Sequence, residues 1–136
     1  MFEYNTVKRV RYGETDQMGF LYYGHYAMYY EIGRAESLRS LGYTYRALEE
    51  SGIMMPVLEF KTKYIRPARY DDLINIVTLL KALPVKNRIV FHTELRSESK
   101  ELLNFGETTL AFINAKTRKT CEIPTFLTDL FRPYFK

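Results

Sequence analysis

The segment around Asp16 combines an acidic side chain with the start of an expected helix. Asp16 stands seven or eight residues before an apolar segment that can form a helix. The first backbone N–H groups of a helix have no partner within the helix and favour negative charge. Acyl transfer needs a base or nucleophile together with donors for a developing oxyanion, so the spacing is compatible with that chemistry. Asp before a helix is also common as a cap or turn residue, and the local pattern leaves both interpretations open.

Other common catalytic patterns are absent from the sequence. His25 and His92 lie in distant parts of the chain and Cys121 is the single cysteine, so no metal-ligand spacing is present. There is no Gly-x-Ser-x-Gly segment, no P-loop and no Gly-x-Gly-x-x-Gly segment. We therefore expect no metal, no dinucleotide and no other cofactor.

Length and charge narrow the classes of protein further. The chain has 136 residues, which predicts one domain over residues 1–136, and 20 Lys and Arg against 16 Asp and Glu give a net charge of +4. Its densest basic run, residues 116–119, is short and lacks aromatic neighbours, so we expect a solvated turn and no nucleic-acid partner. The longest uncharged stretch, residues 17–30, is shorter than the about 20 residues of a membrane span. A lone cysteine and the lack of a signal-peptide pattern favour the cytoplasm.

Hydrophobic patterning predicts one long helix among several strands. Residues 2–12 alternate as a half-buried strand, although Lys8 interrupts the apolar face. Residues 24–41 form an apolar face at helical spacing and are followed by Gly42, a candidate C-cap. The remaining expected elements are a short helix over residues 45–51, strands over 57–65, 73–83, 88–96 and 103–115, a short strand over 120–123 and a helical turn over 125–131.

This order of elements favours an α+β fold in which the strands pair antiparallel. Consecutive long strands without helices between them do not need the crossovers of a parallel sheet. A single sheet that curves around one helix leaves its edge strands open, and pairing with another copy would cover them. We therefore expect a homo-oligomer.

Two blocks of residues carry a resemblance to a known family. The first is Asp16-x-x-Gly19-x-x-Tyr22-x-x-x-Tyr26 followed by Tyr30-Glu31-Ile-Gly-Arg34-Ala-Glu36, and the second runs from Pro56-Val57-x-Glu59 through Lys63-Tyr64-x-x-Pro67-Ala68-x-Tyr70-Asp71-Asp72. Together they resemble the hotdog-fold acyl-CoA thioesterases of the 4-hydroxybenzoyl-CoA thioesterase type, over roughly residues 5 to 130. The resemblance implies a long central helix wrapped by a five-stranded antiparallel sheet, assembled as a homodimer or homotetramer.

The resemblance also implies roles for individual residues. Asp16 matches the family's catalytic carboxylate, either as nucleophile or as general base for water. The backbone N–H of Tyr23 matches the donor that polarises the thioester carbonyl, and Gly19 matches a loop glycine close to the substrate. Many relatives carry His or Asn at the position of Tyr23. A backbone donor does not depend on its side chain, so the oxyanion role is retained.

Acyl-CoA is thus the expected substrate, and further residues are candidates for binding it. Tyr22 and Tyr26 belong to a run of tyrosines that suits either core packing or an aromatic acyl pocket. The phosphates of coenzyme A call for basic residues, for which the candidates are Lys86, Arg88, Lys63 and Arg66, although each also suits a solvated turn. Two other functions stay open, a thioesterase for acyl-carrier proteins and a non-catalytic module that binds acyl thioesters.

Overall fold

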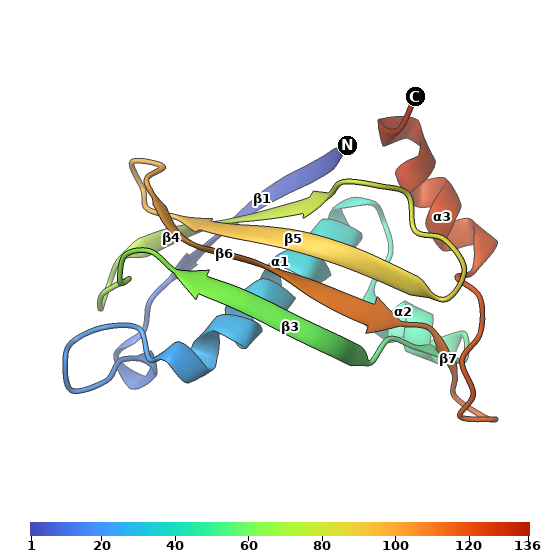
Figure 1. Cartoon of the computed structure of the whole chain (residues 1–136), viewed down its shortest axis with the longest axis horizontal. Coiled ribbons are helices and arrows are strands. Elements are labelled where there is room, and N and C mark those ends of the chain that lie inside the picture. The colour runs from blue at the N-terminus through green and yellow to red at the C-terminus, as the bar shows by residue number, and fades with distance from the viewer.

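The computed structural model describes residues 1–136 and consists of a five-stranded antiparallel sheet wrapped around one long helix, α1 (Tyr26–Ser40) (Figure 1). This confirms the expected α+β fold and its five strands. The strands lie in the order β1 (Phe2–Arg9), β4 (Leu73–Leu80), β5 (Arg88–Arg96), β6 (Leu102–Ala111) and β3 (Val57–Tyr64). The sheet therefore has two edges, β1 and β3.

Smaller elements flank this sheet at the end where β3 begins. The helix α2 (Tyr45–Glu50) is followed by β2 (Ile53–Met54), which pairs with β7 (Ile113–Asn114), and α3 (Thr125–Phe131) lies close to the C-terminus (Figure 1). Single 3₁₀ turns cover Tyr12–Glu14, Tyr23–His25 and Arg132–Tyr134. None of the helices is both long enough and apolar enough to cross a membrane.

The last part of the sheet differs from the sequence prediction. The strand expected over residues 103–115 is two strands, because Phe112 leaves the sheet between β6 and β7. Its N–H donates to the Asn87 carbonyl at 3.1 Å, and its carbonyl accepts from the Cys121 N–H at 2.8 Å. The strand expected over residues 120–123 is wrong, since only an isolated bridge joins Thr120 to Ile113.

Other predicted boundaries shift by a few residues. The first strand ends at Arg9 rather than residue 12, because the chain turns into the 3₁₀ helix at Tyr12–Glu14. The long helix begins at Tyr26 rather than residue 24, since a 3₁₀ turn precedes it. The strand expected over residues 73–83 ends at Leu80, whereas β5 and α3 match the predicted ranges 88–96 and 125–131.

The core between helix and sheet forms two clusters that differ in composition. The first, here called the tyrosine cluster, lies at the start of α1 and consists of Val10, Leu21, Tyr26, Tyr29, Tyr30, Ala68, Ile74, Ile76, Leu95 and Leu103. The second, the phenylalanine cluster, lies beneath α3 and consists of Phe2, Leu38, Leu80, Ile89, Phe91, Leu110, Phe112, Leu127 and Phe131. Burial of both apolar groups drives the helix onto the sheet.

Gly33 sets how closely α1 approaches β4. A Cβ at this position would stand 2.4 Å from the Thr78 Oγ1 atom and 2.6 Å from the Ile76 Cγ2 atom. Only a hydrogen fits, so the middle of the helix rests directly on the sheet.

Candidate active site

Asp16 lies in a tight loop, and its side chain helps to hold the shape of that loop. The Asp16 Oδ1 atom accepts hydrogen bonds from the backbone N–H groups of Met18, at 2.9 Å, and Phe20, at 3.1 Å. The Asp16 N–H donates to the Phe20 carbonyl at 2.9 Å, and Gly19 between them has a φ of +80°, which glycine adopts without strain. The turn role considered for Asp16 is thus present at Oδ1, whereas Oδ2 accepts none of these hydrogen bonds.

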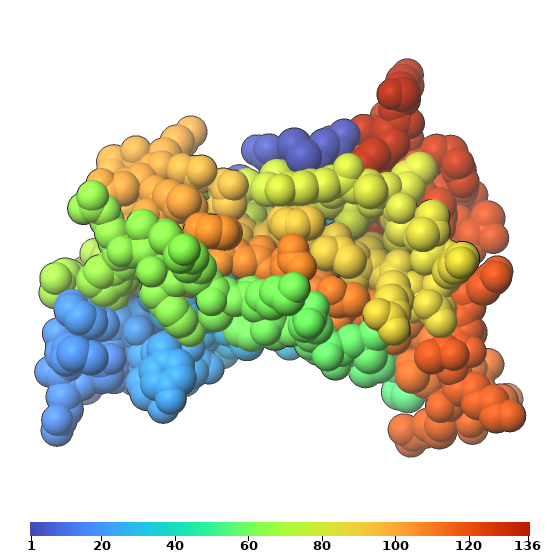
Figure 2. Space-filling view, in the orientation of Figure 1, coloured from blue at the N-terminus to red at the C-terminus, as the bar shows by residue number.

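The half-buried Asp16 side chain also lines a cavity of about 250 Å³. The other lining residues come from the same loop, from the turn before α1 and the first residue of α1, and from the end of β3 and the segment that follows it; they are Met18, Phe20, Leu21, Tyr23, Tyr26, Tyr64, Ile65, Arg66 and Pro67. The Leu21 N–H donates to the Ala68 carbonyl at 2.7 Å and joins the two walls. In the space-filling view the blue loop surface adjoins the green surface that follows β3 (Figure 2).

The turn before α1 contains a lining residue of this cavity, Tyr23, whose backbone N–H has no hydrogen bond. Tyr23 is the first residue of the 3₁₀ turn, and its N–H makes no hydrogen bond to the loop that precedes it. The next closing bond is that of His25, whose N–H donates to the Tyr22 carbonyl at 3.0 Å. The cavity lining therefore includes both an acidic residue, Asp16, and a residue at a helix start with an unpaired N–H, Tyr23.

Tyrosines form one side of the cavity. The Tyr26 ring is buried and meets the Tyr64 ring edge to face, with the centroids 4.8 Å apart. Burial raises the pKa of Tyr26, and the nearby Tyr64 and Asp16 raise it further, so this phenol keeps its proton at neutral pH. Sequence reasoning had not singled out Tyr64, although Tyr64 and Pro67 both stand in the second block that carries the resemblance.

Other residues predicted to bind substrate lie at or near this cavity. Arg66 lines it and forms an ion pair with Glu101, 3.5 Å between nitrogen and oxygen. Lys63 is exposed on the edge strand β3, three residues before Arg66. Tyr22 is outside the lining, and its ring lies 4.8 Å from that of Tyr23. Gly19 is in the Asp16 loop, where its carbonyl accepts from the Tyr70 N–H at 3.4 Å.

Lys86 and Arg88 lie at the opposite end of the sheet. They line a separate hollow of about 450 Å³ with Lys81 and His92, at the turn between β4 and β5 (Figure 1). The nine residues of β5 separate this turn from the Asp16 end, which is about 25 Å at the usual rise per residue. Within one chain, the structure therefore does not bring these two residues to the Asp16 cavity.

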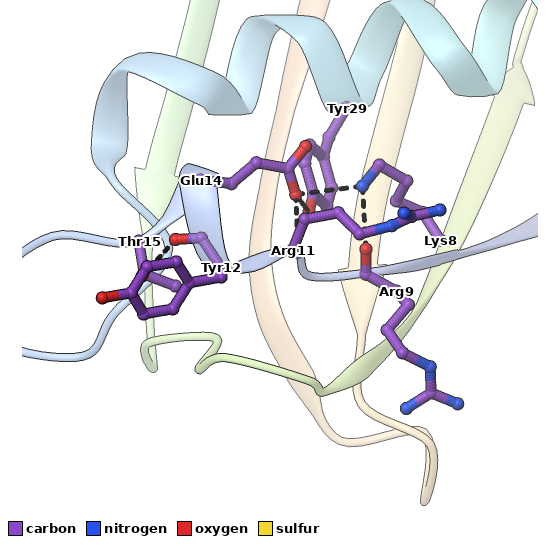
Figure 3. A network of polar contacts seen from close by, with 7 residues as sticks. All are labelled: Lys8, Arg9, Arg11, Tyr12, Glu14, Thr15 and Tyr29. Carbon is purple, nitrogen blue, oxygen red and sulfur yellow. Dashed lines mark hydrogen bonds and ion pairs between the residues drawn. The ribbon is translucent and has the colours of Figure 1, made fainter.

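A partly buried ion pair next to the Asp16 loop was missed by the sequence reasoning. Glu14 Oε1 lies 2.9 Å from Lys8 Nζ and accepts hydrogen bonds from the Tyr29 hydroxyl, at 2.8 Å, and the Arg11 N–H, at 2.9 Å (Figure 3). Lys8 points inward, 5.1 Å from the centre of the Tyr29 ring, which explains its place on the apolar face of β1. This inward position of Lys8 depends on Tyr29, which belongs to a different element, α1.

These contacts fix the charge state of the pair. Burial by itself raises the pKa of Glu14, but the hydrogen bonds from Arg11, Lys8 and Tyr29 outweigh it and leave the pKa below its ordinary value. The pKa of Tyr29 is raised, first by burial and then by the hydrogen bond to the Glu14 carboxylate. Glu14 is therefore ionised and Tyr29 is a neutral donor at neutral pH.

Nowhere in the structure do three or more His, Cys, Asp or Glu side chains gather as the ligands of a metal ion would.

Comparison with known proteins identifies the family and the fold of the chain. Residues 10–131 match the family model described as the thioesterase-like superfamily. The acyl-CoA thioester hydrolase YbgC of Escherichia coli O6:H1 is 27% identical over 124 residues, which are 91% of this chain and 92% of that protein. Bacillus subtilis YneP is 38% identical over 63 residues, 46% of each chain. The crystal structure of a DHNA-CoA thioesterase from Staphylococcus aureus superposes with a TM-score of 0.89 and 30% identity, over 98% of this chain and 89% of that one. With nearly its whole length inside that model, the chain belongs to the thioesterase-like superfamily and has the hotdog fold.

Proposed function

We propose that this protein is an acyl-CoA thioesterase, which uses water to cleave an acyl-CoA into a free acid and coenzyme A. One observation supports the proposal: Asp16 and Tyr23, whose N–H has no backbone hydrogen bond, are lining residues of the same largely apolar cavity. The activity named for the E. coli relative supports it. The unpaired Cys121 favours a reducing compartment, so we place the activity in the cytoplasm.

In this proposal the thioester carbonyl oxygen accepts a hydrogen bond from the Tyr23 N–H while the reaction proceeds at the carbonyl carbon. Such a preorganised donor stabilises the negative charge that develops on that oxygen. Asp16 acts in one of two ways. As a general base it takes a proton from water while the water oxygen bonds to the carbonyl carbon; the C–S bond then breaks, and Asp16 returns that proton to the departing thiolate. As a nucleophile it forms an acyl anhydride and expels the thiolate, and water then hydrolyses the anhydride.

Basic residues supply the contacts to the phosphates of coenzyme A. The candidates for a ligand that extends outward from Asp16 are Arg66, which lines the cavity, and Lys63, which is exposed on β3 three residues earlier. Lys86 and Arg88 are too far away in the same chain and would meet the phosphates only of a ligand held by another copy.

We further propose that the protein forms a homodimer, which could pair again as a homotetramer. β3 bonds to β6 on one side alone, and most of its residues are exposed. An open edge of this kind pairs readily with a second strand. Sedimentation equilibrium tests the assembly, and a monomer at micromolar concentration would contradict it.

Replacing Asp16 tests the catalytic assignment. We expect Asp16→Asn to fold normally and to release thiol from acyl-CoA at least about a hundredfold more slowly, the scale of losing a general base. Asp129→Asn, which alters an exposed carboxylate on α3, is the matched control and should keep wild-type turnover. The assay follows the released thiol with a thiol-reactive dye over short, long and aromatic acyl-CoAs.

The same assay separates the alternatives. Near-normal turnover by folded Asp16→Asn would remove Asp16 from the mechanism. Faster release from acyl-carrier proteins than from any acyl-CoA would change the substrate class. Saturable binding of acyl-CoA by the wild-type protein with no thiol appearing over hours would identify a binding module instead.

A further inference from the structure

We propose that Glu14 is a positioning residue that sets where the Asp16 loop lies relative to the start of α1. The inference rests on the proposed function, because it concerns the placement of the carboxylate that this function uses. It follows from the contacts that Glu14 makes with three parts of the fold.

The Glu14 carboxylate joins the first strand, β1, to the long helix, α1. One oxygen, Oε1, meets Lys8 on β1, the N–H of Arg11 at the entry to the 3₁₀ turn and the Tyr29 hydroxyl on α1 (Figure 3). The Glu14 side chain is only 15% exposed and that of Lys8 19%, so the pair is screened little by solvent. These contacts fix the entry to the Asp16 loop against both the sheet and the helix.

The backbone of Glu14 fixes the exit of the same loop. Its carbonyl accepts a hydrogen bond from the Tyr22 N–H at 2.9 Å, and Thr15 and Leu21, the next residues inward on each side, form a bridge. The free N–H of Tyr23 follows directly after Tyr22. Glu14 thus contacts both the loop that contains Asp16 and the turn that contains Tyr23.

The contacts of Asp16 itself cannot do this. Its Oδ1 bonds, to Met18 and Phe20, lie within the loop and maintain its shape, not its place against α1. Without the Glu14 carboxylate, the Lys8 ammonium and the Tyr29 hydroxyl would lose their shared acceptor in a partly buried region, which is costly. The loop would then settle in a different position above the helix, and catalysis is sensitive to displacements of about 1 Å.

The test compares Glu14→Ala, which removes the carboxylate, with Glu14→Gln, which keeps an oxygen that can accept the same three hydrogen bonds. We expect Glu14→Ala to lower kcat per folded molecule by about tenfold to a hundredfold. KM should stay within about twofold, because the Tyr26 and Tyr64 side of the cavity keeps its place and a small shift of the loop disturbs the alignment of the reacting groups more than the apolar contacts. Glu14→Gln should recover most of kcat although it is less stable than the wild type.

A destabilised control separates positioning from stability. Phe131→Leu weakens the phenylalanine cluster at the other end of the molecule and should lower Tm while leaving kcat per folded molecule unchanged. The inference is overturned if kcat falls equally in Phe131→Leu and Glu14→Ala at matched stability, or if Glu14→Ala keeps wild-type kcat.

A readout that needs no substrate keeps this result separate from the proposed function. The backbone amides of Met18, Phe20 and Tyr23 should shift in ¹H–¹⁵N spectra and exchange faster with solvent in Glu14→Ala, but not in Phe131→Leu. If they respond while the wild-type protein cleaves no thioester, Glu14 positions the loop and the proposed function fails. If they are unchanged in Glu14→Ala, the loop does not depend on Glu14 and the inference fails whatever the activity.

Discussion

The two core clusters stabilise the same helix by different means. In the tyrosine cluster the buried rings carry hydroxyl groups with directed partners: Tyr29 donates to Glu14, and Tyr30 donates to Asn104 and lies 3.1 Å from the Thr62 hydroxyl. In the phenylalanine cluster, Phe2 and Phe91 pack edge to face on Phe131, with centroids 5.3 and 6.4 Å away, and these rings have no polar group to satisfy.

The cluster with directed hydrogen bonds lies at the end of the molecule that contains the candidate active site. Packing between hydrocarbon surfaces is strong but has little directional preference, whereas a buried hydroxyl must find its partner at a defined distance and angle. The end of the molecule that bears Asp16 therefore has a more narrowly defined geometry. The end beneath α3 contributes stability and tolerates small changes of packing.

The largest effect is expected in the phenylalanine cluster. Phe131→Ala should lower the free energy of unfolding by about 3–5 kcal/mol, because a fully buried ring is replaced by a cavity. Turnover per folded molecule should not change. Urea denaturation measures the free energy of unfolding, and a thioesterase assay on the folded fraction measures turnover. A loss of kcat as large as the loss of stability would contradict the separate roles of the two ends.

A smaller loss of stability is expected in the tyrosine cluster. Tyr30→Phe keeps the ring but leaves the Asn104 side-chain oxygen without its donor, which should cost about 1–3 kcal/mol. Burial already raises the pKa of Tyr30, so the hydroxyl is neutral in the range of the measurement. A cost below about 0.5 kcal/mol by urea denaturation would mean that directed bonds matter little here.

Acid should weaken the tyrosine cluster specifically. The lowered pKa of Glu14 means that its ionised form stabilises the fold at pH values above about 4.5, its ordinary pKa. That contribution is lost as the pH falls through the lowered pKa in the folded state. The difference in Tm between the wild-type protein and Glu14→Gln should therefore be largest near neutral pH and shrink towards pH 3. Glu36→Gln, on the exposed side of α1, is the control, and a difference that does not vary with pH would contradict the assignment.

The smallest effect concerns the basic turn at the phenylalanine end. If Lys86 and Arg88 meet the phosphates of a ligand held by another copy, replacing each by Ala should raise KM for acyl-CoA about two- to fivefold and leave kcat unchanged. Higher salt should reduce the difference. An unchanged KM in the double variant at low salt would leave these residues as solvated turn charges.

Local sequence patterns predict most of the strands of the sheet but few of the contacts in the candidate site. The alternation of Ile89, Phe91 and Leu95 predicts β5 correctly, because neighbouring side chains must face opposite sides of the sheet. The break at Phe112 was not predictable, since its hydrogen bonds go to Asn87 and Cys121 and leave the apolar run of the sequence intact.

In the candidate site, too, neighbours in the sequence are predictable and contacts between separate elements are not. The nearness of Asp16 and Tyr23 followed from a short loop before a helix, and the resemblance to a family added their expected roles. The opposite wall with Tyr64 and the contact of Glu14 with Tyr29 on α1 depend on the way separate elements pack, which single-sequence patterns do not report.

The contact of Gly33 with β4 restricts the selectivity of the proposed enzyme. The middle of α1 rests directly on Thr78 and Ile76, so moving the helix to admit a longer or wider acyl group would sacrifice this close packing. Room must come instead from the exchangeable side chains on the rim, above all Met18 and Ile65. We therefore expect changes in substrate range to arise by substitution at these two positions, while α1 keeps its place on the sheet.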